Sequence, residues 1–162
     1  MIEIVKAEQS DLPGIMAIFN DAILNGVATF NIEPWDEARQ LEWFRAHGGK
    51  HPAIVAREGG EVVGWGALNV FIARSAYEAT VEDSVYVRAD RRGRGIGRAL
   101  LARLIELARE IGHHSIVARI ADHAAASIEL HRSLGFEEAG ELRESGRKFG
   151  RWIDVTLMQL ML

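Results

Sequence analysis

The sequence predicts a mixed α/β fold, in which about seven strands form one sheet flanked by about four helices. Residues 95–111 place apolar side chains at helical spacing between two predicted strands, 79–88 and 115–121. Such a strand–helix–strand unit favours a parallel crossover. The Gly59-Gly60 pair instead marks a hairpin between antiparallel strands. The sheet is therefore expected to contain both parallel and antiparallel neighbours.

The first half of the chain is predicted to contain a strand, two helices and a pair of strands. Residues 2–7 alternate apolar and polar side chains, as a half-buried strand does. Asp11 offers an N-cap for a helix with Pro13 in its first turn. After a loop at 26–35, Asp36 is expected to cap a second helix that ends near residue 46. The strands on either side of the glycine pair are predicted at 53–58 and 61–72.

The second half is predicted to continue with strand, helix, strand, helix and two final strands. Gly112 is expected to end the helix at 95–111, and Gly135 the helix at 125–134, because glycine adopts the left-handed conformation of a helix C-terminus without strain. The last two strands are predicted at about 136–142 and 152–161.

Size and composition indicate one globular domain, residues 1–162, and exclude several classes of protein. Of the 162 residues 48% are hydrophobic and none is cysteine, which excludes disulfides and thiolate metal sites. The net charge of −4 disfavours binding of nucleic acid, which needs clustered Lys and Arg. No apolar stretch approaches the roughly 20 residues of a membrane span, and residues 1–11 lack the pattern of a signal peptide. A cytoplasmic protein with no membrane or nucleic-acid partner is expected.

The most informative segment is 85–101, where a predicted strand runs into a glycine-rich turn that opens directly into a helix. Backbone N–H groups at such a helix start lie at the positive end of the helix dipole and suit a phosphate. Gly93, Gly95 and Gly97 place no Cβ in the way of a ligand. Five arginines surround the turn and suggest a polyanionic ligand: Arg88, Arg91, Arg92, Arg94 and Arg98.

Of three phosphate-binding patterns, only one fits this turn. A Walker A loop needs Lys and then Ser or Thr after its last glycine, and neither pair is present. A dinucleotide fingerprint needs a third glycine where Arg98 or Leu100 stands. The pattern Arg/Gln-x-x-Gly-x-Gly/Ala is met in full by Arg92-Gly93-Arg94-Gly95-Ile96-Gly97. The alternative is a surface turn with solvated arginines.

This turn resembles the pyrophosphate loop of the GNAT superfamily of acetyl-CoA-dependent N-acetyltransferases. Four further segments resemble its phosphinothricin and methionine sulfoximine N-acetyltransferase subfamily: residues 73–87, 127–136, 147–155 and 158–160. The resemblance implies a splayed sheet with acetyl-CoA between two strands that part, near 81–88 and 115–121. It also implies direct transfer of the acetyl group to the primary amine of a small amino-acid-like substrate, and a homodimer.

Acetyl transfer to an amine needs a base, because an ammonium group has no lone pair. Glu82 is the candidate, and the resemblance puts the family's base at this position. Strand alternation places Glu82 on one face of the sheet and Asp83 on the other. Contact with Tyr77 and Tyr86 is expected to raise the pKa of the Glu82 carboxyl, which suits a base. The alternative is an exposed glutamate in a salt bridge.

The leaving thiolate must be protonated or stabilised, and the resemblance places His131 there as a general acid. The alternative is a histidine that packs against the cofactor and transfers no proton. The other five histidines show no metal-ligand spacing and are expected at the surface, so no metal is predicted.

The cofactor site is expected to extend along the strand that precedes the turn. A backbone N–H near Val85 to Val87 would polarise the acetyl carbonyl, because a splayed strand leaves donors unpaired. By resemblance, Val85, Tyr86 and Val87 also pair with the pantetheine arm, and Ser127 joins the turn residues in binding the cofactor.

The substrate pocket is expected on the side opposite the cofactor, lined by Thr29, Phe30, Arg74 and Tyr77. Arg74 would hold a substrate carboxylate through two hydrogen bonds. Lys148 and Arg151 are further candidates for that carboxylate, from this chain or a dimer partner, and Trp152 is expected in the core.

Two positions depart from the family's usual pattern. Ala124 stands where an Asn usually contacts the pantetheine, a loss of one hydrogen bond worth roughly 0.5–1.5 kcal/mol. Ile72 stands where a basic residue is usual, which argues against phosphinothricin itself and leaves other amino-acid analogues favoured. Two other functions stay open: acetylation of a protein or peptide amine, and a CoA-binding sensor without catalysis.

Overall fold

A computed structural model describes all 162 residues and contains one seven-stranded sheet in the order β1-β2-β3-β4-β5-β7-β6. Every neighbouring pair is antiparallel except β4 and β5, which are parallel. The strands are β1 Ile2–Lys6, β2 Ala53–Glu58, β3 Glu61–Val70, β4 Thr80–Val87, β5 Ser115–Ala121, β6 Glu137–Lys148 and β7 Arg151–Met161. The helices are α1 Leu12–Asn25, α2 Glu37–Ala46, α3 Ile96–Ile111 and α4 Ala125–Ser133, with short 3₁₀ turns at 9–11, 75–77 and 89–91.

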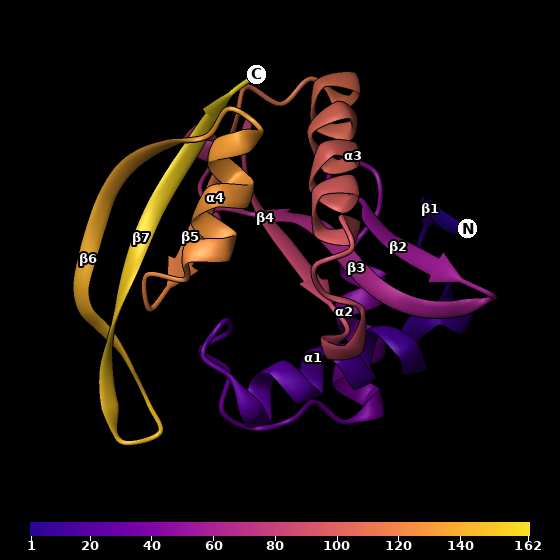
Figure 1. Cartoon of the computed structure of the whole chain (residues 1–162). Helices are drawn as coiled ribbons and strands as arrows, with labels where there is room; N and C mark the ends of the chain where they lie inside the picture. Colours follow the sequence, from indigo (N-terminus) through magenta and orange to yellow (C-terminus); the bar gives the residue numbers. More distant parts are fainter.

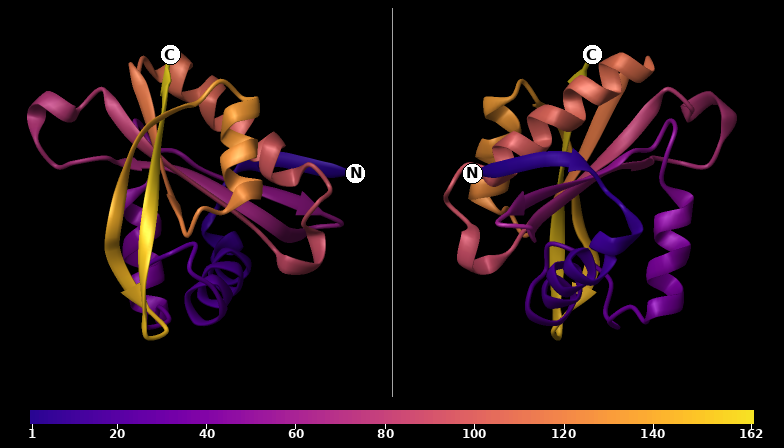
Figure 2. Two further views of the ribbon diagram at one scale, coloured as in Figure 1. Left: turned by 60° about the vertical axis from the view of Figure 1, so that its left-hand side comes forward. Right: turned by 90° about the vertical axis from the view of Figure 1, so that its right-hand side faces the viewer.

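The helices cover both faces of the sheet. Helices α3 and α4 lie on one face and α1 and α2 on the other, while β6 and β7 form a long hairpin at one edge (Figures 1 and 2). Two separate hydrophobic clusters result, one between α3 and the sheet and one between α1 and the sheet. None of the four helices combines the length and apolarity that a membrane crossing requires.

The predicted mixed sheet of seven strands and four helices is confirmed, and most predicted elements are present near their expected bounds. Strands β2 and β5 occupy the predicted residues. Asp36 caps α2, because its side chain accepts a hydrogen bond from the Arg39 N–H at 2.9 Å. Gly112 ends α3 in the left-handed conformation, with φ +96°.

Strand β6 was predicted to end at 142 but continues to Lys148. Its residues are exposed almost throughout, so it carries no alternation of apolar and polar side chains. Pairing with β7 forms it instead, with register shifts that include one between Leu142 and Gly146. A strand that buries neither face leaves no periodic signal in the sequence, and this accounts for the error.

Helix α3 packs unusually close to β3 because two glycines face it. A Cβ at Gly64 would lie 3.1 Å from the Leu100 side chain, and one at Gly66 would lie 3.0 Å from that of Leu104. The close approach seats the buried face of α3 on the sheet and places its N-terminus just beyond the end of β4.

Strands β4 and β5 part soon after they begin to pair. Only three residue pairs join them, from Thr80 with Ser115 to Glu82 with Val117. Beyond this point β4 stays paired with β3 up to Val87, and β5 stays paired with β7 up to Ala121. The backbone of residues 83–87 that faces β5 is therefore without a strand partner, and a wedge opens in the sheet.

Candidate active site

A cavity of about 650 Å³ occupies the region where β4 and β5 part. Its lining comes from both faces of the sheet, because side chains alternate along β4. Seven of the predicted site residues meet here: Thr29, Phe30, Glu82, Val85, Tyr86, Ser127 and His131. Ala124 also lines the cavity.

Glu82 lies on the α1 face of β4 and forms an ion pair, as its alternative interpretation expected, but with a partner that the sequence did not reveal. Its Oε2 lies 3.2 Å from Nε of Arg119 on β5, with 24% of the Glu82 side chain exposed. Burial raises the pKa of the Glu82 carboxyl; Arg119 opposes the rise and the negative charge of Asp83 adds to it. The raised pKa is as predicted, but its cause is burial at the cavity, without any contact to Tyr77.

Aromatic side chains form the wall of the cavity beside Glu82. The Tyr86 ring stacks on Trp65 at 4.9 Å between centroids, and both pack edge-on against Phe19. Burial raises the pKa of Tyr86 to about 12, so its hydroxyl stays protonated at neutral pH. The side chain of Tyr86 thus lies on the α1 face of the strand, as Glu82 does, and only its backbone faces the wedge.

Asn69 on β3 holds β4 through hydrogen bonds to two of its residues. Its amide Nδ2 donates to the backbone carbonyl of Glu82 at 3.1 Å and to Oγ of Ser84 at 2.9 Å. Its Oδ1 lies 2.9 Å from Nε2 of His47, whose Nδ1 lies 2.8 Å from the carbonyl of Trp43. This network ties α2 to the strand that carries Glu82. No local pattern marked Asn69 or His47, because their partners lie far away in the sequence.

His131 lies on the opposite face of the sheet and is buried. Its Nε2 is 2.8 Å from Oδ2 of Asp83, and its Nδ1 is 2.7 Å from the carbonyl of Ser127. Burial alone would lower the pKa of His131, but the hydrogen bond and charge of Asp83, with the Ser127 carbonyl, raise it above its usual value. Asp83 was placed on the correct face by strand alternation but was not identified as a site residue.

The glycine turn lies beyond the cavity, at the start of α3. No side chain caps this helix, and Gly95 occupies its N-cap with φ +79°. Gly93 has φ +72°, and a Cβ at either glycine would meet no other atom within 4 Å. The glycines are thus required by backbone conformation, and the space above them is open. Ile96 has its side chain in the core, 2% exposed, so it offers only its backbone to a ligand.

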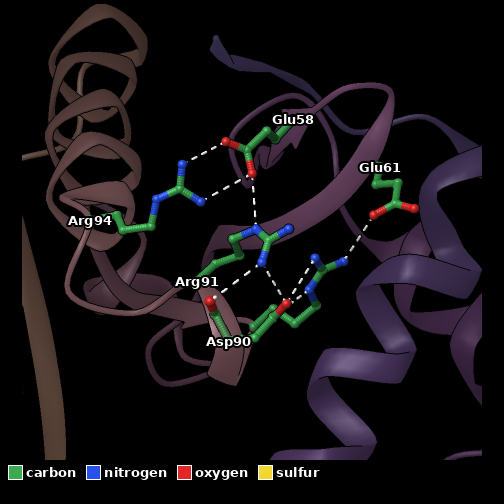
Figure 3. Close-up of polar contacts among 6 residues, drawn as sticks. Glu58, Glu61, Asp90, Arg91 and Arg94 are labelled. Carbon is green, nitrogen blue, oxygen red and sulfur yellow. Dashed lines mark hydrogen bonds and ion pairs between the residues drawn. The ribbon is translucent and has the colours of Figure 1, made fainter.

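Three of the five arginines around the turn are held by acidic residues (Figure 3). Arg91 and Arg94 both bind Glu58 on β2, at 2.9 and 2.7 Å. Arg88 binds Asp90 at 2.7 Å and Glu61 at 3.3 Å. Arg92 and Arg98 make no ion pair and donate instead to the Val87 carbonyl and to Ser133. Three of the five arginines are thus paired with acidic side chains of the chain itself, and Arg92 and Arg98 are the two without an acidic partner.

Besides the glycine turn, three residues predicted near the substrate or cofactor lie outside the cavity lining. Arg74 and Tyr77 do not line it, and Tyr77 packs edge-on against Phe71 at 5.5 Å. Val87 faces the α3 cluster. Arg119 is the only arginine or lysine in the cavity lining. No local signal singled out Arg119, because its relation to Glu82 depends on the pairing of two strands that are distant in the chain.

The loop at 26–35 is fastened to the C-terminal hairpin at two points. The buried Lys148 donates to the carbonyl of Thr29 at 2.9 Å, and burial lowers the pKa of its amine. The ring of Phe30 lies directly over Gly146, where any Cβ would overlap it. Lys148 is thus a structural tether in this chain. The other candidate for a carboxylate, Arg151, binds Asp122 at 2.7 Å.

Two further expectations about side chains are corrected. Trp152 does not pack in the core: 56% of it is exposed, with Arg147 lying 4.9 Å from its ring. His113 is not at the surface: it is buried, and its Nε2 lies 2.7 Å from the Lys50 carbonyl.

A surface cluster of histidine and carboxylates was also not foreseen. Nε2 of His123 lies 3.2 Å from Asp154 and 3.3 Å from Glu141, outside the cavity lining. The three ligand atoms lie within 4.8 Å of one another, and the group is largely exposed. An exposed His–carboxylate group of this kind is accounted for by surface ion pairing.

Comparison with known proteins agrees with this geometry. The model of the acetyltransferase (GNAT) family matches residues 15–136. The L-methionine sulfoximine/L-methionine sulfone acetyltransferase of Pseudomonas aeruginosa is 49% identical over 156 residues, covering 94% of this chain and 90% of that protein.

Two solved structures share the whole fold. The ribosomal-protein-alanine N-acetyltransferase of Brucella melitensis is 43% identical, with a TM-score of 0.96 and 99% of each chain covered. A phosphinothricin acetyltransferase of Sinorhizobium meliloti in complex with acetyl-CoA is 38% identical, with a TM-score of 0.96, covering 99% of this chain and 88% of that one. The chain therefore belongs to the GNAT family of acetyltransferases.

Proposed function

We propose that this protein transfers the acetyl group of acetyl-CoA to the primary amine of a small amino-acid analogue, of the methionine sulfoximine, methionine sulfone or phosphinothricin type. The observation that carries the proposal is the cavity at the parting strands, with Glu82 on one side of β4 and His131 on the other. Relatives with these activities support the substrate class. Residues 1–162 act as one catalytic domain.

The fit of acetyl-CoA to this chain rests on its backbone. The uncapped N-terminus of α3 offers N–H groups to the diphosphate, beneath the open space above Gly93 and Gly95. The unpaired edge of residues 83–87 offers main-chain partners to the pantetheine arm. Ser127 and the uncharged Ala124 line the cavity at the far side of the wedge.

Glu82 takes the proton from the amine. Burial raises the pKa of the Glu82 carboxyl and so brings it nearer to the pKa of the ammonium group that Glu82 must deprotonate. Because a carboxylate is the active form, turnover rises with pH through the pKa of Glu82. A backbone N–H of residues 85–87 polarises the acetyl carbonyl, and direct attack in a ternary complex needs no covalent enzyme intermediate.

The amino-acid substrate lies against the aromatic wall, between Tyr86 and Phe30. Arg119 is placed to hold its carboxylate, because it is the only arginine or lysine in the lining and is itself 46% exposed. Because Arg119 is the only arginine or lysine in the lining, one carboxylate is matched by a cation and a second anionic group is not. This favours sulfoximine and sulfone substrates over the doubly anionic phosphinothricin.

The protein functions as a homodimer in the cytoplasm, without nucleic acid, membrane or metal. Support for the dimer comes from three exposed apolar side chains, Leu24, Ile32 and Phe149, which surround a second cavity of about 320 Å³ beside the hairpin of β6 and β7. Exposed apolar surface of this kind marks a site of protein association.

A protein or peptide amine is the second candidate, because one similar structure is named a ribosomal-protein-alanine N-acetyltransferase. The fastening of the loop at 26–35 to the hairpin favours a small substrate over an extended peptide. A sensor without catalysis is disfavoured, because burial raises the pKa of the Glu82 carboxyl beside an open cavity, as a base requires.

A thiol-release assay with acetyl-CoA and a panel of amines tests the proposal. We expect rapid release with methionine sulfoximine and methionine sulfone, slower release with phosphinothricin, and none with peptides of the same amino-terminal residues. Release with peptides alone would establish the second candidate. Tight binding of acetyl-CoA with no release for any amine would establish the sensor.

A further inference from the structure

A buried carboxylate–histidine pair lies on the face of the sheet opposite Glu82. Asp83 extends from β4 and His131 from α4, with Oδ2 and Nε2 2.8 Å apart and side chains only 3% and 6% exposed. Asp83 interrupts a row of valines on that face of the strand. A buried charge costs several kcal/mol unless it is paired. Both residues line the cavity, so the cost is incurred where the chemistry takes place.

The hydrogen bonds of His131 fix the number of protons on the pair. The Ser127 carbonyl can only accept, so the Nδ1 that lies 2.7 Å from it carries a hydrogen. The other nitrogen faces a carboxylate oxygen at 2.8 Å, so one more proton lies between Nε2 and Oδ2. The ring therefore has no free lone pair with which to act as a base.

The surroundings hold that proton in place. Asp83 is the one charged group within ion-pair distance of the ring. Its second oxygen, Oδ1, is buried and meets no donor of the chain, so His131 is the one side chain that donates to this carboxylate. The remaining neighbours do not compete: Phe136 meets the ring edge-on, Glu82 and Arg119 pair on the other face, and Arg98 of α3 binds Ser133.

We infer that Asp83 is a positioning residue that holds His131 as an imidazolium, which makes His131 the acid that protonates the leaving CoA thiolate and excludes it as the base. The inference rests on the proposed function. As the neutral amine nitrogen bonds to the acetyl carbon, the carbon–sulfur bond breaks and its electron pair passes to sulfur. The sulfur takes the Nε2 proton of His131. Glu82 passes the ammonium proton to solvent before the attack, and it then takes the second proton that the nitrogen releases as the amide forms.

The protonation state is tested first, without any ligand. Side-chain ¹⁵N NMR of the histidines of the full-length protein, titrated from about pH 5.5 to about pH 9, reports both nitrogens of His131. We expect both to be protonated at neutral pH, and D83N to lower the midpoint by roughly 1–3 pH units, the effect of removing a contacting opposite charge. A neutral His131 at pH 7 in the wild type would overturn the inference, whether or not the variant folds.

Asp154→Asn provides the matched control, since it removes the same charge from an exposed Asp–His pair. It should leave the midpoint of His131 unchanged. In kinetics, the alkaline limb of the kcat profile should move to lower pH in D83N and stay in place in the control. If Asp83 had only a structural role, D83N would lower the midpoint of thermal unfolding and leave the alkaline limb of the kcat profile at its wild-type pH.

The two proposals fail separately. Turnover with an unshifted alkaline limb in D83N would reject the role of Asp83 and leave the acetyltransferase intact. Absence of turnover with every amine would reject the proposed function, while the NMR titration would still decide the protonation state of His131.

Discussion

At the scale of single residues, two adjacent positions of one strand carry the carboxylates that serve the base and the acid of the site. Glu82 and Asp83 are neighbours, yet alternation sends one carboxylate to the substrate side and the other to the cofactor side. Each carboxylate forms an ion pair that sets a protonation state. Arg119 keeps Glu82 available as a carboxylate, and Asp83 keeps His131 protonated. The alternation of side chains along one strand thus allows two adjacent carboxylates to serve different steps, one as the base and one as the partner of the acid.

Substitution of Glu82 by Gln should lower kcat by about 10²–10⁴, the usual contribution of a general base. Gln keeps the shape of the side chain but cannot take a proton, so acetyl-CoA should still bind, as calorimetry can measure. Glu137→Gln, an exposed change on β6, is the control and should leave kcat unaltered. Unchanged turnover in E82Q would reject Glu82 as the base.

Residues of the site were predictable from the sequence only where one segment carries the information. Glu82 and His131 lie in segments that resemble the GNAT family, and the resemblance singled them out. Arg119, Asn69 and His47 act through partners on other strands and helices, which no local pattern specifies. The carboxylate of Asp83 within a row of valines was a visible signal, because a charge at a buried strand position calls for a partner.

At the scale of elements, the turn before α3 and the hairpin of β6 and β7 frame the two ends of the site. The turn was predictable because its glycines serve local backbone geometry, with positive φ at Gly93 and Gly95. The length of β6 was not, because that strand is formed by pairing rather than by burial. The acidic partners of the arginines were also hidden, since Glu58 comes from β2.

Gly95→Val should abolish measurable binding of acetyl-CoA in calorimetry, because the side chain would occupy the open space at the helix start. Gly112→Val is the control for backbone strain without a steric block of the ligand, because it places the same residue at the other end of α3 with a similar positive φ. Both variants should lose stability in thermal melts by a similar amount, roughly 1–2 kcal/mol. Retained affinity in G95V would contradict the phosphate site.

Gly146→Ala should raise the KM for the amine several-fold and leave the affinity for acetyl-CoA unchanged. The new methyl group would displace the Phe30 ring, which lines the cavity from the substrate side. Gly26→Ala is the control, because a methyl group is accepted there: φ is −148°, and a Cβ would meet only the Ala22 carbonyl oxygen, at an ordinary 3.5 Å. Steady-state kinetics with each substrate varied in turn would measure both effects; an unchanged KM in G146A would show that Phe30 does not contact the amine.

At the scale of the whole molecule, the function depends on a defect in an otherwise continuous sheet. Five of the six pairs of neighbouring strands are antiparallel and pair at length, whereas β4 and β5 are parallel and join through only three residue pairs. The order of elements and the parallel crossover could be predicted from hydrophobic periodicity. The point at which the strands part could not be derived from that pattern, because both strands continue as regular strands with other partners.

The most direct test of the account is a crystal structure of the protein with acetyl-CoA bound. The account predicts the diphosphate within hydrogen-bond distance of the backbone N–H groups at the start of α3, the pantetheine along residues 83–87, and the thioester between Glu82 and His131. A donor bound elsewhere on the chain, or with its thioester remote from Glu82, would contradict it.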